Sequence, residues 1–235
     1  MNQCTFQRIA DLDNLVRSSA QNKRCIVLLH GFGANFSDLT GISGVLDPLQ
    51  NWDWYFPNGP EEISFSPAYA GRAWFPLDMQ KLELALVRGE RRPFRNEVPS
   101  GFSNASLKLD KMLRELSARY DQIVIGGFSQ GSMVSCDVAL HTEVPVTALL
   151  LLSSNIIASQ RWQDAIQNKP KDQGSAFKVF QSHGQFDQVL PIEGAKDLAS
   201  FWSEADYSLE YVSFPGGHEI PYPVLDRLKA FLSSL

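Results

Sequence analysis

The chain has few cysteines and histidines and no long apolar run, and each shortage argues against a class of protein. Its three cysteines, Cys4, Cys25 and Cys136, are an odd number, and no two have the spacing of metal ligands. A disulfide framework and a zinc site are therefore not expected. Cys25 and Cys136 lie in apolar segments, where a free thiol behaves as a small hydrophobic group. This usage is typical of a reducing compartment, and we expect a cytoplasmic protein.

An excess of positive charge is also missing. The formal net charge is −5, which provides no general basic surface to bind nucleic acid through its phosphates. The N-terminal residues 1–14 contain no basic region followed by an apolar run, so we expect no signal peptide. The longest apolar stretch, around Ala148–Leu152, has the length of a strand and not of a membrane span. Peripheral contact with a membrane surface stays open as an alternative.

The composition is that of a globular protein with a sizeable core. The chain has 235 residues, of which 44% are hydrophobic and 20% are charged, and no repeat or linker divides it. We therefore expect a single domain over residues 1–235. Apolar strand-like runs alternate with helical patterns, which predicts an α/β fold with a mostly parallel, doubly wound sheet and helices on both faces. In such sheets, reactive groups gather in the loops after the carboxyl ends of the strands.

The periodicity also predicts where the elements lie. Strands are expected at residues 25–29, 52–56, 123–126, 146–152, 177–180 and 209–214. Helices are expected at about 37–48, from Ser100 or Ser103 to 120, and at 132–141, 159–167, 191–205 and 223–232. Residues 5–16 fit either a strand or a short helix.

The least regular part of the chain runs from residue 57 to residue 101 and is rich in proline and aromatic residues. Residues 77–87 within it fit a short amphipathic helix. A connection of this length in a compact domain is more often functional than idle. We therefore interpret residues 58–100 as an excursion or lid beside the functional site.

The strongest chemical signal is the stretch 123–133. Gly127-Phe128-Ser129-Gln130-Gly131 matches the G-x-S-x-G pattern, with a predicted strand before it and a predicted helix after it. In a nucleophile elbow of this kind the serine lies on a sharp turn, and the glycines leave room for strand and helix to approach each other. Ser129 is therefore predicted to be a nucleophile; the alternative is a Gly-rich turn with an exposed serine.

A serine nucleophile needs an imidazole base nearby. The chain has four histidines. His218 follows the last predicted strand in a Gly-Gly turn and is the best candidate. His141 ends the elbow helix, His30 suits a scaffolding role in its loop, and His183 is expected to hold the loop that follows it.

The imidazole in turn needs a carboxylate that orients it. Asp187 follows a predicted strand end and so lies on the same sheet edge as Ser129. Asp172 and Asp206 lie at strand starts on the opposite edge, and Asp137 is two turns into the elbow helix. The order Ser129, Asp187, His218 along the chain is typical of α/β-hydrolases.

Acyl transfer also needs donors for the oxyanion that develops. The backbone N–H of Gln130, directly after Ser129, is one candidate. The loop of residues 30–35 follows the first predicted strand and offers the backbone N–H of Phe32 as a second. The alternative is that this loop is an ordinary strand-to-helix turn.

Four motifs, LLHGFGAN, GGFSQGS, HGQFDQVLP and GGHEIP, resemble in this order the phospholipase/carboxylesterase family, whose best-known members are acyl-protein thioesterases. The resemblance runs from about Cys25 to the C-terminus. It implies an α/β-hydrolase fold, a triad of Ser129, Asp187 and His218, and oxyanion donors at Phe32 and Gln130. It also implies that no cofactor is needed.

The resemblance extends to an acyl-binding region. The family's Trp-Phe-Asp segment corresponds to Trp74-Phe75, with the acidic residue displaced by two positions to Asp78. We hypothesise that apolar residues of the excursion line an acyl groove: Trp74, Phe75, Leu82, Leu84, Leu86 and Val87. The alternative is that they pack on the surface of the sheet.

The sequence thus predicts a serine carboxylesterase or thioesterase that hydrolyses short- to medium-chain acyl esters through an acyl-enzyme on Ser129. A lysophospholipase and an acyl-protein thioesterase are alternatives with the same chemistry, and a catalytically silent binding module is an alternative of another class. The expected partner is an acyl ester or thioester on a small molecule, a lipid or a protein. Neither a metal nor nucleic acid is expected, and both a monomer and a homodimer stay open.

Overall fold

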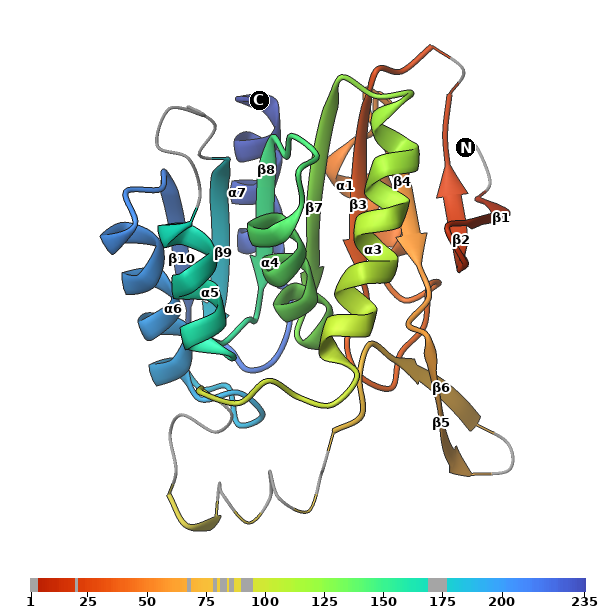
Figure 1. Cartoon of the computed structure of the whole chain (residues 1–235). Helices are drawn as coiled ribbons and strands as arrows, with labels where there is room; N and C mark the ends of the chain where they lie inside the picture. Colours follow the sequence, from red (N-terminus) through yellow and green to blue (C-terminus); the bar gives the residue numbers. More distant parts are fainter. Residues whose placement is uncertain are drawn as a thin grey trace.

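A mixed β-sheet runs through the centre of the molecule (Figure 1). The computed structural model describes residues 4–19, 21–66, 69–77, 80, 84, 87–89, 95–168 and 177–235. Within them, eight strands follow the order β1-β2-β4-β3-β7-β8-β9-β10. Their bounds are β1 (Thr5–Ile9), β2 (Leu12–Arg17), β3 (Arg24–Leu29), β4 (Asp53–Pro57), β7 (Gln122–Phe128), β8 (Ala148–Leu152), β9 (Lys178–Gly184) and β10 (Leu209–Phe214).

The predicted α/β class is confirmed, with one addition at the N-terminus. The strands from β4 to β10 in the sheet order are parallel to one another. Residues 5–16, which fitted a strand or a helix, lie in an antiparallel hairpin of β1 and β2 that joins the sheet edge next to β4. The hairpin turn uses Ala10 and Asp11, both with positive φ. A two-residue turn of this kind matches the twist of the strands that it joins. The pattern of apolar residues in 5–16 could not indicate this turn.

The central strands are apolar throughout because both of their faces are covered. In β3, Cys25, Val27 and Leu29 belong to one hydrophobic cluster, whereas Ile26 and Leu28 belong to a second cluster. Strands β7 and β8 alternate in the same way. The sheet therefore separates two cores.

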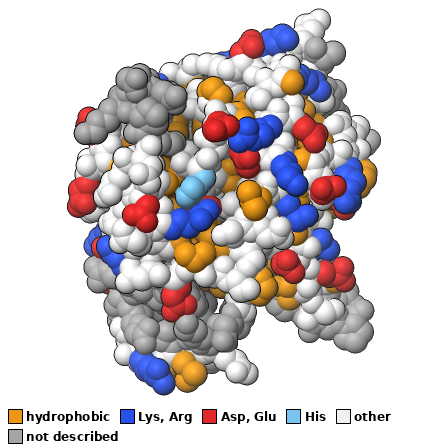
Figure 2. All heavy atoms as spheres, in the orientation of Figure 1, with side chains coloured by type: hydrophobic (Ala, Val, Ile, Leu, Met, Phe, Trp, Pro, Cys, Tyr) orange, Lys and Arg blue, Asp and Glu red, His pale blue; other side chains and the backbone are white. Residues whose placement is uncertain are grey.

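Helices cover both cores, as Figure 1 shows. The first core packs under α3 (Phe102–Ser117), α4 (Gln130–His141), α5 (Ser159–Gln167) and α6 (Ile192–Glu204). The second core packs under α1 (Thr40–Leu46) and α7 (Tyr222–Ser233) on the other face. Acidic and basic side chains are interspersed over the face that α3, α4 and α5 cover (Figure 2). Several are paired there, for example Arg114 with both Asp110 and Glu143.

The excursion contains structure that the sequence did not predict. A hairpin of β5 (Glu61–Ser66) and β6 (Tyr69–Ala73) projects from the main sheet (Figure 1). Most of the helix expected at residues 77–87 lies outside the described residues. The helix expected to begin at Ser100 or Ser103 begins at Phe102, and its N-cap is Gly101 with φ of 79° and no side-chain cap. Neither serine therefore begins this helix, because a backbone turn with positive φ at Gly101 starts it.

The helices of the described residues are all too short or too polar to cross a bilayer.

The direction of the strands decides where the site lies. Since β3, β7, β8, β9 and β10 are parallel, their carboxyl ends share one edge, the lower one in Figure 1. The loops that carry the predicted site residues all leave from that edge.

Candidate active site

Ser129 lies between the end of β7 and the start of α4, on a turn that is strained. Its φ of 53° and ψ of −120° fall outside the regions that a non-glycine residue prefers. The turn is possible because two glycines allow the backbones to approach. A Cβ at Gly131 would lie 2.5 Å from the carbonyl oxygen of His30, and a Cβ at Gly127 would lie 2.6 Å from the carbonyl carbon of Gly131. Holding a residue in such a conformation costs about 1–3 kcal/mol of folding free energy, and favourable packing around the turn has to offset this cost.

Asp187 and His218 meet across the loops that follow β9 and β10. His218 Nδ1 lies 2.7 Å from Asp187 Oδ2. The two loops are tied together by backbone bonds from Gln185 N–H to Phe214 O at 2.8 Å and from Phe186 N–H to Gly216 O at 2.9 Å. Ser129 and His218 both line one cavity, and the His218 ring lies 4.7 Å from the ring of Phe128. The three residues predicted from the sequence therefore gather at one sheet edge.

The carboxylate of Asp187 is buried and held in a fixed orientation. Its Oδ1 accepts hydrogen bonds from the backbone N–H groups of Val189 and Leu190 at 2.9 and 2.8 Å. Burial by itself would raise the pKa of Asp187, but the hydrogen bond and charge of His218 and the Leu190 N–H outweigh it and lower the pKa. Asp187 is therefore ionised at neutral pH. The proton between the two residues is assigned to His218 Nδ1, which leaves Nε2 as the basic nitrogen.

The other histidines have structural contacts. The ring of His183 is buried and lies 2.8 Å from the carbonyl of Leu190, so it holds the loop that carries Asp187. His141 binds the carbonyl of Asp137 one turn earlier in α4. Asp137 itself is buried among Ser106, Arg161 and Trp162.

His30 links three segments around the loop of residues 30–35. Its Nε2 accepts a hydrogen bond from Gly59 N–H at 3.0 Å, and its Nδ1 donates to Gly31 O at 2.7 Å. Its carbonyl accepts from the indole N–H of Trp74 at 2.9 Å. Burial lowers the pKa of His30 to about 4, so the ring is neutral at pH 7. This is the scaffolding role that the sequence predicted.

The β5–β6 hairpin holds the same loop from outside. Gly33 N–H donates to Arg72 O at 2.9 Å, and Arg72 N–H donates to Ala34 O at 2.7 Å, so β6 pairs with the loop as a strand would. A Cβ at Gly71 would overlap the Gly33 carbonyl. The backbone around Phe32 is therefore positioned by a segment about 40 residues further along the chain.

Gln130 contributes more than its backbone. Its N–H begins α4, where helix N–H groups have no acceptor within the helix. Its side-chain Oε1 accepts from Trp74 N–H at 2.9 Å, and its Nε2 donates to Phe75 O at 2.7 Å. The buried amide thus fastens the segment that follows β6 to the elbow.

The cavity beside Ser129 has a volume of about 200 Å³ and a mostly apolar lining. The lining residues are Gly31, Phe32, Phe75, Leu77, Pro99, Phe128, Ser129, Gln130, Met133, Asn155, Ile157, Val189, Leu190 and His218. It is smaller than the roughly 300–1,000 Å³ typical of pockets for drug-sized ligands. Its size suits a small apolar group next to the serine.

The residues predicted for an acyl groove differ in their positions. Phe75 lines the cavity. Trp74 is fully buried behind it and is absent from the lining. Leu84 and Val87 are exposed, with exposed fractions of 54% and 79%, and Leu82 and Leu86 lie outside the described residues. Packing on the sheet thus accounts for Trp74, whereas Phe75 faces the cavity.

Several lining residues were not singled out from the sequence. Met133 lies one turn after Gln130 on α4, and helical spacing could have indicated it. Asn155 and Ile157 follow β8, and the rule that reactive groups lie at strand ends could have found Asn155. Val189 and Leu190 come two and three residues after Asp187, but nothing in their pattern shows on which side of the loop they lie.

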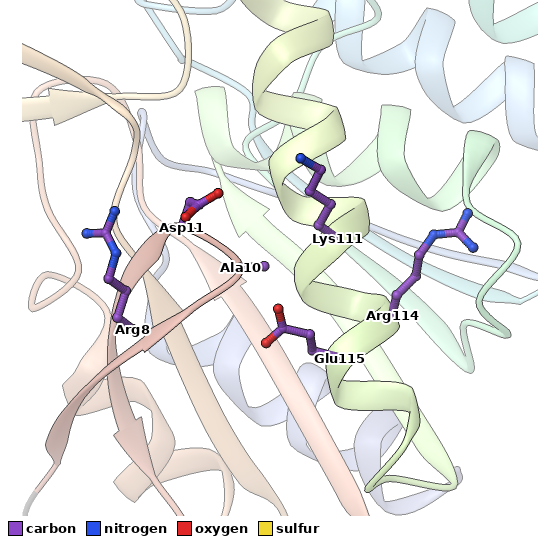
Figure 3. Close-up of a pocket in the computed structure, with 6 residues that line it drawn as sticks. All are labelled: Arg8, Ala10, Asp11, Lys111, Arg114 and Glu115. Atoms are coloured by element: carbon purple, nitrogen blue, oxygen red, sulfur yellow. The ribbon is translucent and has the colours of Figure 1, made fainter.

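A larger hollow of about 620 Å³ lies elsewhere, between the β1–β2 turn and α3 (Figure 3). Arg8, Ala10, Asp11, Lys111, Arg114 and Glu115 line it. Arg8 is paired with Asp13 at 2.8 Å and Arg114 with Asp110 at 2.9 Å. These six residues include no nucleophile with a base beside it, whereas the smaller cavity is lined by both Ser129 and His218.

The lowered pKa of His30 predicts a loss of stability in acid. An unfolded histidine takes up a proton as the pH falls through about 6.5, whereas folded His30 does so only at about 4. Between these values the unfolded state binds more protons, so the free energy of unfolding decreases as the pH falls, by about 2 kcal/mol between pH 7 and pH 5. In urea denaturation, His30→Asn should lose this contribution. The difference in free energy of unfolding between wild type and variant should therefore be about 2 kcal/mol smaller at pH 5 than at pH 7. Parallel pH curves would contradict the assignment.

Comparisons with known proteins identify the family. Residues 11–235 match the family model for Phospholipase/Carboxylesterase. Acyl-protein thioesterase 1 of Gibberella zeae is 26% identical over 239 residues, which cover 96% of this chain and 95% of that protein. The protein of the same name from Eremothecium gossypii is 28% identical over 228 residues, covering 90% and 88%.

Solved structures share the fold. The crystal structure of esterase PE8 has a TM-score of 0.74 at 24% identity and covers 99% of this chain and 98% of that one. Acyl-protein thioesterase 2 of Zea mays has a TM-score of 0.73 at 19% identity, with coverage of 94% and 97%. The chain therefore belongs to the phospholipase/carboxylesterase family of α/β-hydrolases and is a hydrolase of the esterase or thioesterase type.

Proposed function

We propose that the protein is a serine carboxylesterase or thioesterase that releases short- to medium-chain acyl groups through an acyl-enzyme on Ser129. The observation that carries the proposal is the 2.7 Å hydrogen bond between His218 and the Asp187 carboxylate, beside a cavity that Ser129 and His218 both line. Family membership supports it. A carboxylate, an imidazole and a strained serine in one site are the parts that acyl transfer needs.

The reaction would proceed in two steps. Ser129 Oγ attacks the acyl carbonyl while His218 Nε2 takes its proton, and the tetrahedral intermediate collapses when Nε2 gives that proton to the departing alcohol or thiol. A water molecule then loses a proton to Nε2 and attacks the acyl-enzyme, and the second collapse returns that proton to Ser129 and frees the acid. Asp187 stabilises the imidazolium in both steps.

The oxyanion would be stabilised by the backbone N–H groups of Phe32 and Gln130. Both residues line the cavity, and Gln130 is the first residue of α4, where the helix dipole favours negative charge. Main-chain donors need a rigid backbone. The ring of His30 and the pairing of β6 with residues 33–34 supply that rigidity.

The small volume of the cavity favours short to medium acyl groups. We propose that a longer chain would leave the cavity along the excursion and contact apolar residues there, with Leu82, Leu84 and Leu86 as candidates. Acyl-protein thioesterase and lysophospholipase activities are the alternatives within this chemistry. The relatives named acyl-protein thioesterase 1 support the former.

The triad predicts which variants lose activity. Ser129→Ala should abolish labelling by a fluorophosphonate probe, because the probe needs the nucleophilic oxygen. Asp187→Asn should lower kcat on p-nitrophenyl butanoate about 10⁴-fold, since the imidazole loses its orienting carboxylate. Ser117→Ala and Asp226→Asn, at exposed positions of α3 and α7, are the matched controls. Wild-type protein that reacts with neither probe nor ester at any neutral pH would favour a silent binding module.

The role of the Phe32 backbone is tested through Gly71, because a side-chain change at Phe32 leaves the N–H in place. Gly71→Ala forces a methyl group against the Gly33 carbonyl, which should shift the loop and lower kcat about 10²-fold, with a smaller change in KM. Gly41→Ala, whose added methyl group meets no atom within 4 Å, is the control. Equal kinetics for the two variants would show that the loop does not position a donor.

The acyl preference is tested with p-nitrophenyl esters from acetate to hexadecanoate. We expect kcat/KM to peak between four and eight carbons. Leu84→Gln should reduce the octanoate value about fivefold and the acetate value less than twofold, since a short chain makes no contact there. Leu49→Gln, exposed after α1, is the control. A peak at hexadecanoate would favour depalmitoylation, and equal losses on both esters would remove Leu84 from the groove.

A further inference from the structure

The ring of Phe128 touches the proposed base, His218, although the proton transfers of the reaction do not involve it. Phe128 is the last residue of β7 and directly precedes Ser129. Its ring centroid lies 4.7 Å from that of His218, with 48° between the ring planes, a separation at which aromatic rings are in contact. Both residues line the cavity beside Ser129. One half-buried side chain therefore joins the base to the residue next to the nucleophile.

His218 depends on side-chain contacts for its orientation, because its own loop restrains it little. It follows two glycines, and a Cβ added at Gly217 would meet no atom within 4 Å. The hydrogen bond between Nδ1 and Asp187 Oδ2, at 2.7 Å, fixes one corner of the imidazole. A ring held at one corner can still pivot about that bond, and such a pivot displaces Nε2 relative to Ser129 Oγ.

The Phe128 ring is itself fixed from two sides. A Cβ added at Gly31 would lie 3.2 Å from Phe128 Cδ1 and 3.7 Å from Cε1, so the ring packs against the backbone of the loop of residues 30–35. The side chain also packs against the second hydrophobic core, and its backbone pairs with Leu152 of β8. A ring held in this way blocks the pivot of the imidazole on the side where the two rings meet, because packed side chains leave few voids in which to move.

We propose that Phe128 is a positioning residue for the reaction, and that its ring keeps Nε2 of His218 aligned with Ser129 Oγ and with the departing oxygen or sulfur. This inference rests on the proposed function, since it concerns the base of that reaction. The nucleophile and the support of the base are then consecutive residues of the elbow, so one rigid turn sets the distance between them. A displacement of about 1 Å in such a site can lower a rate about 100-fold.

The test compares two esters with the same acyl group, ethyl butanoate and p-nitrophenyl butanoate. For both, Nε2 takes the serine proton. Ethoxide also has to receive that proton from Nε2 as it departs, whereas p-nitrophenolate can depart as an anion. In Phe128→Leu we therefore expect kcat/KM, which reports formation of the acyl-enzyme, to fall about 100-fold on the ethyl ester and about tenfold on the p-nitrophenyl ester. A loss through misfolding or weaker acyl binding would be equal for both esters.

Phe231→Leu is the matched control. Phe231 lies on α7 in the core against which Phe128 packs, with its ring 5.4 Å from that of Phe180, and it does not line the cavity. This change should alter kcat/KM on the two esters by the same factor. If Phe128→Leu does not fold, Phe128→Met takes its place, because methionine fills irregular space without a ring.

Equal losses on the two esters in the Phe128 variant, or a larger loss on the p-nitrophenyl ester, would overturn the inference. The first result indicates a packing role alone, and the second a contact with the nitrophenyl group. Wild-type activity on the p-nitrophenyl ester alone would also overturn it, because His218 would then not be placed to protonate a departing alcohol. Wild-type protein that hydrolyses neither ester would instead overturn the proposed function.

Discussion

The rest of the site depends on the close approach of α4 to the end of β3 beneath Ser129. The space for it exists only because positions 127 and 131 lack side chains. The turn is held on its far side by the neighbouring strand, since Ser129 N–H donates to Leu152 O at 2.9 Å. The register of β3, β7 and β8 thus supports a serine whose φ of 53° an isolated turn would not adopt. A sheet with two packed faces can sustain such strain because its strands cannot shift independently.

Around this turn, loops from distant parts of the chain are locked by buried polar contacts. His30 accepts from Gly59 and supports Trp74, while Gln130 fastens Trp74 and Phe75 to the elbow. The β5–β6 hairpin adds a second set of backbone bonds to the loop of residues 30–35. These contacts connect the excursion to the proposed oxyanion donors. The irregular segment therefore has a structural role in the site, whichever acyl group the cavity receives.

The same segment explains why the cavity is small. Phe75 and Leu77 close it on one side, and Ile157 and Leu190 close it on the other. These side chains limit the group that the cavity itself can hold, so a longer chain would have to leave it along the excursion.

The sequence by itself predicted most of the elements and the candidate reactive residues. Apolar runs with turns between them predicted the parallel sheet, and the position of Ser129, Asp187 and His218 after strands predicted that they share one edge, because parallel strands end on the same side. The hairpin at 61–73 and the Gly101 cap were missed, since backbone pairing and positive φ leave little trace in hydrophobic periodicity. Only the tertiary structure decided that the Trp74 indole donates to the His30 carbonyl while Phe75 lines the cavity. Which side of a loop faces a cavity depends on contacts between residues far apart in the chain, and local pattern does not encode them.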